Sequence, residues 1–456
     1  PYTTLFRSLD LISEGEIEGS ATASKEGITD RTSAAYTNAY LKDVFLNDTP
    51  ILKASASSSS PQTTDFNFQN VTFTPRFGTA GQTKISGIES SSSITPVGVT
   101  VTASTPVTRQ ITNTNVDRIK VTITFPQIQK ATTEGDLLGS TVEYKISVQY
   151  NSGGFTDVIT SANGGKVTGR TADAYQRDHS IQITGAFPVD IRVSRVTADS
   201  TDTSLIDAFQ FTSFAEIIDD ASTYANSAYN AIRLDSQQFS SIPRRKFRIR
   251  GIKVRIPGAG ASSIFNGVMG AAVWCSCPAM ILLDLLTTER YGFGTHIADS
   301  SLDLFSFVTA SKFANTLVDD GFGGEEARFS CNVNIQSSSE AFDLINELAG
   351  VMRCMPIWST GSILLAQDSP KDSSFLFSLA NISSDGFNYS GSSLKQRHSV
   401  ISVSYFNMDS QEIDYEVFEN TDISSKIGTV VKQVKGFGCT SRGQALRLAK
   451  AIAFSE

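Results

Sequence analysis

Short runs of alternating apolar and polar residues, each closed by a turn, restrict the fold of this chain more than any other feature. The alternation is clear over Ile119–Phe125, Val142–Tyr150 and Asp190–Val196, and a period of two residues is typical of strands with one buried face. The sequences NSGG at 151–154 and NGG at 163–165 supply residues that tight hairpin turns favour. These runs predict an antiparallel, β-sandwich-like domain.

The residues on both sides of this predicted domain are also strand-like, so we interpret it as an insertion into another β domain. With 456 residues the chain can form several cores. We predict an α+β, predominantly β fold with several domains, built from β-barrel or sandwich domains and a smaller α/β part. The predicted boundaries are a β segment at 1–63, the inserted sandwich at 64–200, a continuing β segment at 201–260, an α+β domain at 261–367, a second β domain at 368–440 and the start of a helix at 441–456. The serine-rich stretches at 55–60 and 90–93 are predicted to be surface loops.

Helices are predicted only in the second half of the chain. Proline suits a first helical turn, and serine or threonine followed three residues later by glutamate or glutamine is typical of a helix start. The predicted starts are Pro278, Ser300 or Ser301, the pair Ser337 and Glu340, and the pair Ser441 and Gln444.

The apolar stretch Val268–Leu286 is long enough to raise the question of a membrane span. It contains Pro278 and Asp284, and the proline divides it. We therefore predict a buried strand or loop followed by a buried helix, and no transmembrane segment. The N-terminus also lacks the charged and apolar regions of a signal peptide.

The densest basic segment runs from 244 to 257 and is the candidate interface of this chain. On a strand, alternate residues project from one face. The basic residues occupy even-numbered positions before Gly251 and odd-numbered positions after it, so they would change face there. This change predicts a bulge or kink at Gly251. The segment could face DNA or an acidic partner, or its charges could pair with acidic neighbours in an assembly; the net charge of −8 favours pairing and argues against specific nucleic-acid binding. The basic residues are Arg244, Lys246, Arg248 and Arg250 before the kink, and Lys253 and Arg255 after it.

The sequence predicts no catalytic, cofactor or metal site. Cys275 and Cys277 are too close for the usual metal-binding pair, and the acidic, glycine-rich run at 319–326 does not match a calcium loop. The carboxylates Glu14, Glu16 and Glu18 share a face if extended, which is typical of a solvated edge or a subunit salt-bridge surface. The five cysteines are too few and scattered for a disulfide framework, so we predict reduced thiols and assembly in a cytoplasm.

Several short strings, in one order along nearly the whole chain, resemble the tip attachment proteins, or central tail hubs, of lambda-like phages with long non-contractile tails. The closest is GCTSRGQA at 438–445. The others include DLISEGEIEG at 10–19, VFLNDTP at 44–50, CPA at 277–279, DGFGG at 320–324 and FNYSG at 387–391.

The resemblance implies a structural hub that closes the distal end of the tail as a homotrimer within the virion. It implies as partners the distal tail and tail-tip adaptor proteins, and the tape-measure protein held in the lumen. The fibronectin-like modules and the receptor-binding tip of such proteins are expected to lie beyond Glu456, so the host receptor would be bound only through a part absent here. The chain begins at Pro1 and ends within a helical pattern, and we expect it to be a portion of a longer protein.

Two other functions are weighed against the structural hub. A receptor-binding adhesin would bind host cells through this portion alone. A cell-wall-degrading enzyme of the tail would need paired carboxylates or a metal site, for which the sequence offers no pattern. The hub is the function that we predict, and the chain is predicted not to be an enzyme.

Overall fold

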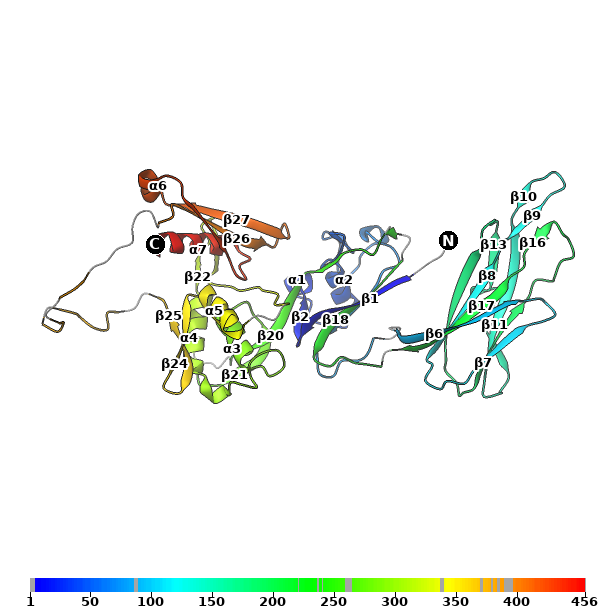
Figure 1. The fold of residues 1–456 in the computed structure, drawn as a ribbon, viewed down its shortest axis with the longest axis horizontal. Coiled ribbons are helices and arrows are strands. Elements are labelled where there is room, and N and C mark those ends of the chain that lie inside the picture. Colours follow the sequence, from blue (N-terminus) through cyan, green and yellow to red (C-terminus); the bar gives the residue numbers. More distant parts are fainter. Residues whose placement is uncertain are drawn as a thin grey trace. The chain divides into compact units, whose positions relative to one another are not determined.

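The computed structural model describes residues 5–85, 89–219, 221–235, 238–239, 241–258, 265–336, 340–369, 372–378, 380–383, 386–388 and 397–455. The chain divides into two compact units, which are described separately. The first contains residues 1–13 and 20–249, and the second contains residues 14–19 and 250–456. The predicted α+β, predominantly β, multi-domain class is confirmed, with sandwich and small open sheets among the described residues and no closed barrel (Figure 1).

The N-terminal part of the first unit combines two three-stranded sheets with two short helices. One sheet has the order β1 (Leu5–Glu14), β18 (Ser227–Asp235) and β5 (Thr72–Phe77), and the other has the order β19 (Arg245–Phe247), β3 (Val44–Leu46) and β4 (Thr49–Pro50). The turn between β3 and β4 has positive φ at Asn47 and Asp48, which a two-residue hairpin turn of type I′ requires. Tyr40, Leu46 and Ile51 are among the buried residues of this core.

The prediction that helices occur only in the second half is wrong, because α1 (Ala21–Lys25) and α2 (Ala34–Leu41) lie in the first unit. Serines start both: Ser20 Oγ accepts a hydrogen bond from Ala23 N, and Ser33 Oγ accepts one from Tyr36 N. Helix α1 has only five residues, and α2 carries alanines on its exposed side as well as its buried side. The contrast between faces by which an amphipathic helix is detected is therefore missing.

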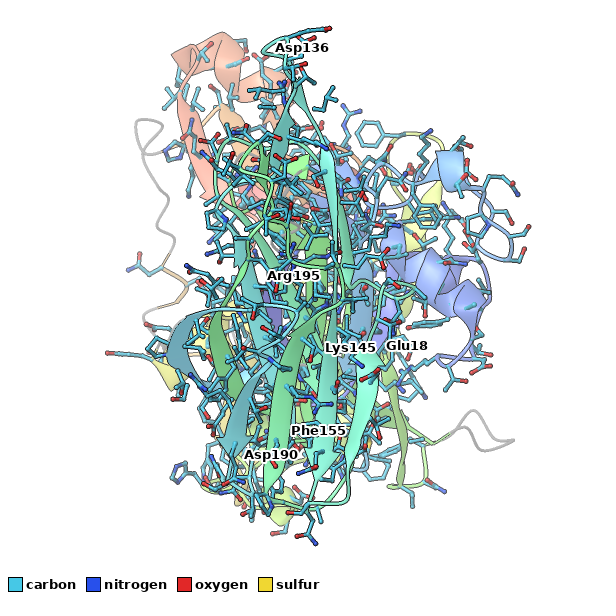
Figure 2. All side chains as sticks on the ribbon, turned by 90° about the vertical axis from the view of Figure 1, so that its right-hand side faces the viewer. Glu18, Asp136, Lys145, Phe155, Asp190 and Arg195 are labelled. Atoms are coloured by element: carbon cyan, nitrogen blue, oxygen red, sulfur yellow. The ribbon has the colours of Figure 1, made fainter. Side chains whose placement is uncertain are left out.

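A β-sandwich occupies the range from 89 to 219. Its first sheet has the order β14 (Tyr175–Gln182), β8 (Arg118–Phe125), β17 (Gln210–Asp219) and β6 (Glu89–Thr100). Its second has the order β12 (Phe155–Ile159), β11 (Ser140–Tyr150), β15 (Val189–Arg195) and β7 (Val107–Ile111), with β13 (Lys166–Gly169) also paired to β11. A small sheet of β10 (Leu137–Leu138), β9 (Gln129–Ala131) and β16 (Leu205–Ile206) extends it near Asp136, at the end opposite Asp190 in Figure 2.

The sandwich core explains why its strands were visible in the sequence. Alternate residues of β8, β11 and β15 are buried and form one apolar cluster, and Phe125 of one sheet meets Tyr144 of the other with ring centroids 6.0 Å apart. The three strand predictions and the turn at 151–154 are confirmed. The prediction of a loop at 90–93 is wrong, since these serines lie on the edge strand β6, where Ser91, Ser92 and Ser93 pair with β17 and have exposed side chains. The boundaries 64–200 stay a prediction.

The second unit begins with a three-stranded sheet of β2 (Ile17–Ser20), β20 (Ile249–Pro257) and β21 (Met269–Trp274). A helical layer follows: α3 (Pro278–Thr287), α4 (Leu304–Asn315) and α5 (Ala341–Val351), with the hairpins β22 (Leu317–Asp319)–β23 (Glu325–Ala327) and β24 (Cys354–Ser359)–β25 (Ser362–Gln367). The stretch 268–286 thus forms a strand and a helix that starts at a proline. The helix is largely buried as predicted. The prediction of a buried strand is wrong, because Ala271, Ala272 and Val273 of β21 are exposed. Within the described parts of the chain, no helix is long and apolar enough to span a membrane.

The predicted helix starts are partly confirmed. Pro278 opens α3 and the helix after Ser441 forms, but α4 is capped by Asp303 rather than Ser300 or Ser301, because the Asp303 carboxylate accepts a hydrogen bond from Phe305 N. Ser337 lies outside the described residues. The C-terminal part has a sheet of order β27 (Glu412–Glu419), β26 (Val400–Asn407) and β28 (Val431–Lys435), the helix α6 (Thr421–Ile427), and α7 (Arg442–Ser455), which packs on β26 and β27.

Candidate interface and pocket

The basic segment is divided between the two compact units, so each half is built from its own neighbours. Its strand is interrupted at Arg248, and β20 runs through Gly251, where a kink was predicted. The interruption has a local cause. Arg248 N donates to the carbonyl oxygen of Asp43, and the Arg248 guanidinium donates to the Asp43 carboxylate, each at 2.8 Å. These bonds hold Arg248 between the ends of β19 and β20.

Three of the predicted interface residues in the first unit are paired with aspartates. Arg244 and Lys246 share the carboxylate of Asp48, with 2.7 Å between Arg244 Nη2 and Asp48 Oδ2. Hydrogen bonds from Lys246 and Arg244 lower the pKa of Asp48. Arg248 instead binds the fully buried Asp43, so its charge supports the core rather than the surface.

Sequence reasoning missed the strongest ion pair of this half. Arg245 Nε and Nη2 each donate to the carboxylate of Asp10 at 2.8 Å, which is a bidentate contact. Arg245 lies at an odd-numbered position, unlike the predicted interface residues before Gly251. Its partner Asp10 lies 235 positions earlier, so no local sequence pattern connects the two residues.

In the second unit, the acidic residues Glu14, Glu16 and Glu18 form ion pairs with basic residues of the same chain. Lys253 Nζ lies 2.8 Å from Glu16 Oε1 and 3.6 Å from Glu18 Oε2, while Glu14 pairs with Arg290 at 2.6 Å. The Arg250 guanidinium lies 4.4 Å from the ring centroid of Trp274, a stacked cation–π contact.

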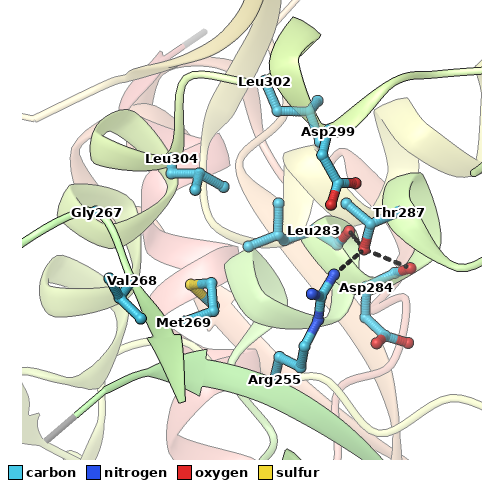
Figure 3. A pocket seen from close by; sticks show the side chains of 10 residues that line it. All are labelled: Arg255, Gly267, Val268, Met269, Leu283, Asp284, Thr287, Asp299, Leu302 and Leu304. Carbon is cyan, nitrogen blue, oxygen red and sulfur yellow. Dashed lines mark hydrogen bonds between the residues drawn. The ribbon is translucent and has the colours of Figure 1, made fainter. Parts of the chain in front are cut away.

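Neither Arg250 nor Arg255 forms an ion pair with a described residue, and Arg255 also lacks the ring contact that Arg250 makes with Trp274. Arg255 Nη2 donates one hydrogen bond, 3.3 Å long, to Thr287 Oγ1. It lines a cavity of about 290 Å³ whose apolar wall includes Met269, Leu283 and Leu302 (Figure 3). A guanidinium with one hydrogen bond keeps donors for a further carboxylate or amide oxygen.

The pocket also contains two carboxylates, those of Asp284 and Asp299. Burial raises the pKa of Asp284, while hydrogen bonds from Tyr291 and Thr288 and the charge of Arg255 oppose the rise. Tyr291 donates its hydroxyl to Asp284 Oδ2 at 2.6 Å. The tyrosine therefore holds the Asp284 side chain in place as part of the local structure.

The other residues singled out for chemistry have structural roles. In the acidic run, Asp320 Oδ1 accepts hydrogen bonds from Phe322 N and Gly324 N and closes the turn between β22 and β23. These backbone bonds lower the pKa of Asp320. All five cysteines are free thiols. No group of three or more histidine, cysteine, aspartate or glutamate side chains that could hold a metal is found within the described ranges.

The string at 438–445 packs against the segment that follows β23 and against the turn between β22 and β23. A Cβ at Gly438 would clash with Cys331 Sγ, and one at Gly443 would meet the Asp320 carbonyl oxygen at 2.6 Å. Ser441 Oγ accepts from Gln444 N, as predicted for a helix start, but Gln444 Oε1 accepts from Ser330 instead of completing the capping box. Close packing therefore accounts for both glycines of the string.

The fold and the site define a multi-domain, β-rich chain in which several basic residues of the segment bind acidic side chains of the same chain. Residues 91–220 match the family model of the FNIII-A domain of tip attachment protein J. The chain is 28% identical over 422 residues to "Tip attachment protein J" of Escherichia phage SECphi27, covering 90% of this chain and 34% of that protein. It is 29% identical over 451 residues to "Tip attachment protein J" of Escherichia phage SECphi4, covering 97% of this chain and 37% of that protein.

These findings confirm the resemblance inferred from the sequence strings and support a structural component of a phage tail tip. The chain spans about a third of the length of the two relatives. Neither they nor the family model carries the name of an enzyme. A solved structure titled "CBM4 structure and function" matches 30% of the chain with 10% identity and a TM-score of 0.13, which is too low to carry an argument.

One expectation drawn from the resemblance is wrong. Fibronectin-like modules were expected only beyond Glu456, yet a family model of that description matches residues 91–220, and these residues form most of the β-sandwich. The sandwich was predicted from its strand pattern, and its interpretation as an inserted domain stays a prediction. Its kind was missed because alternation and turns describe any antiparallel sandwich and do not separate one class from another.

Proposed function

We propose that this chain is a structural hub subunit at the distal tip of a phage tail, where it closes the tail end as a homotrimer. The carrying observation is that similarity to proteins named tip attachment protein J extends over 90% and 97% of the chain, rather than over one domain. The proposed partners are the distal tail and tail-tip adaptor proteins and the tape-measure protein in the lumen. Host recognition would be carried by parts outside this chain, and assembly would take place in the host cytoplasm.

The chemistry of the described residues supports a scaffold rather than an enzyme. Carboxylates that could act in pairs are instead bound to arginine, lysine or backbone groups, as at Asp10, Asp43 and Asp320. Such groups hold strands and turns together and are not free to exchange protons with a substrate. The adhesin and the wall-degrading enzyme have no comparable observation in their favour.

The oligomeric state tests the hub directly. We expect mass photometry of the purified chain at assembly concentrations, and reconstruction of the tail tip in virions, to show three copies. One copy per virion tip would contradict the proposal. Turnover of peptidoglycan above a heat-killed control would favour the enzyme, and blocking of infection by this chain alone would favour the adhesin.

The basic segment is proposed as a subunit or partner interface, and the structure indicates which residues test it. Arg248 binds buried Asp43, so reversing its charge would disturb folding as well as assembly. Arg244 and Arg255 are exposed, so Arg244→Glu and Arg255→Glu are expected to impair tip assembly with little change in the melting temperature of the chain. Wild-type assembly by both variants would remove the interface proposal and leave the hub proposal standing.

A further inference from the structure

The cavity beside Arg255 lies between three elements of the second unit. Arg255 belongs to β20 and Met269 to β21, and these two strands pair with each other. Leu283 and Thr287 belong to α3, and Asp299 begins the short 3₁₀ helix that precedes α4 (Figure 3). Side chains from a strand pair and from two helical segments therefore line one site.

The apolar lining of the cavity extends from the core to the solvent. Leu283 and Leu302 are buried, whereas Val268 is 60% exposed. The volume of about 290 Å³ lies just below the range of about 300–1,000 Å³ that is typical of sites for small molecules. A site of this size suits a side chain of a partner protein better than a large cofactor.

Two side chains of opposite charge line the cavity and do not bind each other. Arg255 donates one hydrogen bond to Thr287 Oγ1, and that hydroxyl donates to the carbonyl oxygen of Leu283 at 3.0 Å. The Asp299 carboxylate forms no hydrogen bond or ion pair with a described residue. In Figure 3 the side chains of Arg255 and Asp299 point toward Thr287 from opposite sides, so a group bound between them can contact both.

Asp284, the third charged residue of the cavity, already has partners within the chain. Its Oδ2 accepts a hydrogen bond from the Tyr291 hydroxyl at 2.6 Å, and Thr288 also hydrogen-bonds to its carboxylate. The groups that remain for a ligand are therefore the N–H donors of Arg255 and the carboxylate oxygens of Asp299.

A side-chain amide matches these two groups better than a charged side chain does. Its carbonyl oxygen can accept from Arg255 while its NH₂ group donates to Asp299, and both hydrogen bonds are charge-assisted. A carboxylate would instead bring a negative charge close to Asp284 and Asp299, and an ammonium group would bring a positive charge close to Arg255. Like charges placed together oppose binding.

We propose that the cavity binds a glutamine or asparagine side chain of a tail partner protein, with the amide group between Arg255 and Asp299. An apolar side chain next to the amide residue in the partner covers Val268 and Met269, where burial of apolar surface favours binding. The proposal rests on the partner interface of the proposed function, and it names the chemical group that this interface recognises at Arg255.

Methionine methyl resonances test the binding, because Met269 lines the cavity, whereas Met355 and Met408 are exposed residues outside its lining. The full chain, labelled with ¹³C in its methionine methyl groups, is titrated with acetyl-leucyl-glutamine amide. The same dipeptide with glutamate, lysine or methionine in place of glutamine serves as comparison, and Met269→Leu assigns the resonance.

We expect the glutamine dipeptide to shift the Met269 resonance and to bind about tenfold more tightly than each of the other three. The resonances of Met355 and Met408 should stay in place. A Met269 resonance that does not move would overturn the proposal, and so would a glutamate, lysine or methionine dipeptide that binds as tightly as the glutamine dipeptide.

A variant of the same size tests the selection against acids. Asp299→Asn removes the negative charge, so the affinity for the glutamate dipeptide is expected to rise about tenfold relative to the wild-type chain. Asp136→Asn, at an exposed position of the sandwich, should leave that affinity unchanged, and unshifted Met355 and Met408 resonances show that each variant is folded. An affinity that does not respond to Asp299→Asn would overturn the proposal.

The titrations use the single chain, so they separate this proposal from the hub. Failure of the glutamine dipeptide to bind, in a chain that still forms trimers, would overturn the amide site alone. Binding by a chain that stays monomeric would support the amide site and contradict the homotrimer.

Discussion

The inserted sandwich and the C-terminal sheet are both antiparallel in the main, but only the sandwich completes its own core. Its two sheets supply apolar residues to one shared interior, where Phe125, Tyr144 and Phe209 contact one another. Among the described residues, α7 covers one face of the sheet of β27, β26 and β28. On the other, open face, Ile413, Tyr415 and Val417 of β27 are exposed beside buried Val400 and Ser402 of β26. A sheet needs a cover on each apolar face, so the sandwich can be stable as it stands and the C-terminal sheet calls for a neighbour.

The same difference appears in the helix that covers the C-terminal sheet. Helix α7 meets β26 through Ala445, Ala449 and Ala453, which recur every four residues and are buried. Small side chains allow the helix to approach the sheet closely, but they contribute little buried area. The sandwich interior instead uses large aromatic and branched residues, so its stability depends more strongly on each side chain.

The largest effect is expected from truncating the sandwich core. Phe125→Ala should lower the free energy of unfolding of the sandwich by about 3–5 kcal/mol, because the ring is fully buried and its loss leaves a cavity. Hydrogen exchange of peptides from β8 and β11, followed by mass spectrometry, measures the local change. Phe406→Ala on the open sheet face is the matched control, with an expected loss below about 1 kcal/mol in the single chain. Equal losses in the two variants would contradict the contrast between closed and open sheets.

A smaller effect is expected from enlarging an alanine under α7. Ala449→Leu adds a branched side chain where the helix lies directly on β26, so it should destabilise the C-terminal sheet by about 1–3 kcal/mol through overpacking. Hydrogen exchange in β26 and β27 should rise while exchange in the sandwich stays the same. Ala451→Leu, at a half-buried position of the same helix, controls for the added leucine. Unchanged protection of β26 would show that the alanines do not set the distance between helix and sheet.

The contrast between the closed sandwich and the C-terminal sheet also explains how well the sequence predicts each region. The sandwich strands alternate strongly because each has one buried and one exposed face, so Ile119–Phe125 and Val142–Tyr150 were predicted close to their observed bounds. In β27 the stripe of Ile413, Tyr415 and Val417 also alternates, but it points away from the helix. Alternation identifies the strand and does not tell which face is covered.

Long-range pairing accounts for most of what the sequence could not predict about the site. The parity rule found Arg244 and Arg248, but their partners Asp48 and Asp43 lie about two hundred positions away. It missed Arg245, whose partner Asp10 is equally distant in the sequence. No local pattern connects residues at that separation, and the pocket beside Arg255 depends on α3 and on Asp299 as well. The C-terminal string was predicted as a helix start, whereas its two glycines are explained only by the loop packed against them.

The smallest effect concerns a polar pair in the sandwich and depends on pH. His179 Nε2 and the Tyr144 hydroxyl lie 2.6 Å apart, and burial lowers the pKa of His179 from 6.5 to about 4. The unfolded chain therefore binds a proton below pH 6.5 that the folded chain does not bind until about pH 4. The histidine's contribution to stability is complete above pH 6.5 and is lost as the pH falls toward 4.

We expect the wild-type sandwich to lose about 1–2 kcal/mol more than a His179→Gln variant between pH 6.5 and pH 4, after allowance for the ring's remaining contact with solvent. Glutamine cannot titrate in this range and can still hydrogen-bond to Tyr144. Unfolding of the sandwich by urea at a series of pH values gives the two slopes, and His296→Gln, at an exposed position, should follow the wild type. Parallel slopes for wild type and His179→Gln would mean that the imidazole is protonated in the folded sandwich as readily as in the unfolded chain. The interior would then be open to water, and the contrast with the C-terminal sheet would no longer hold.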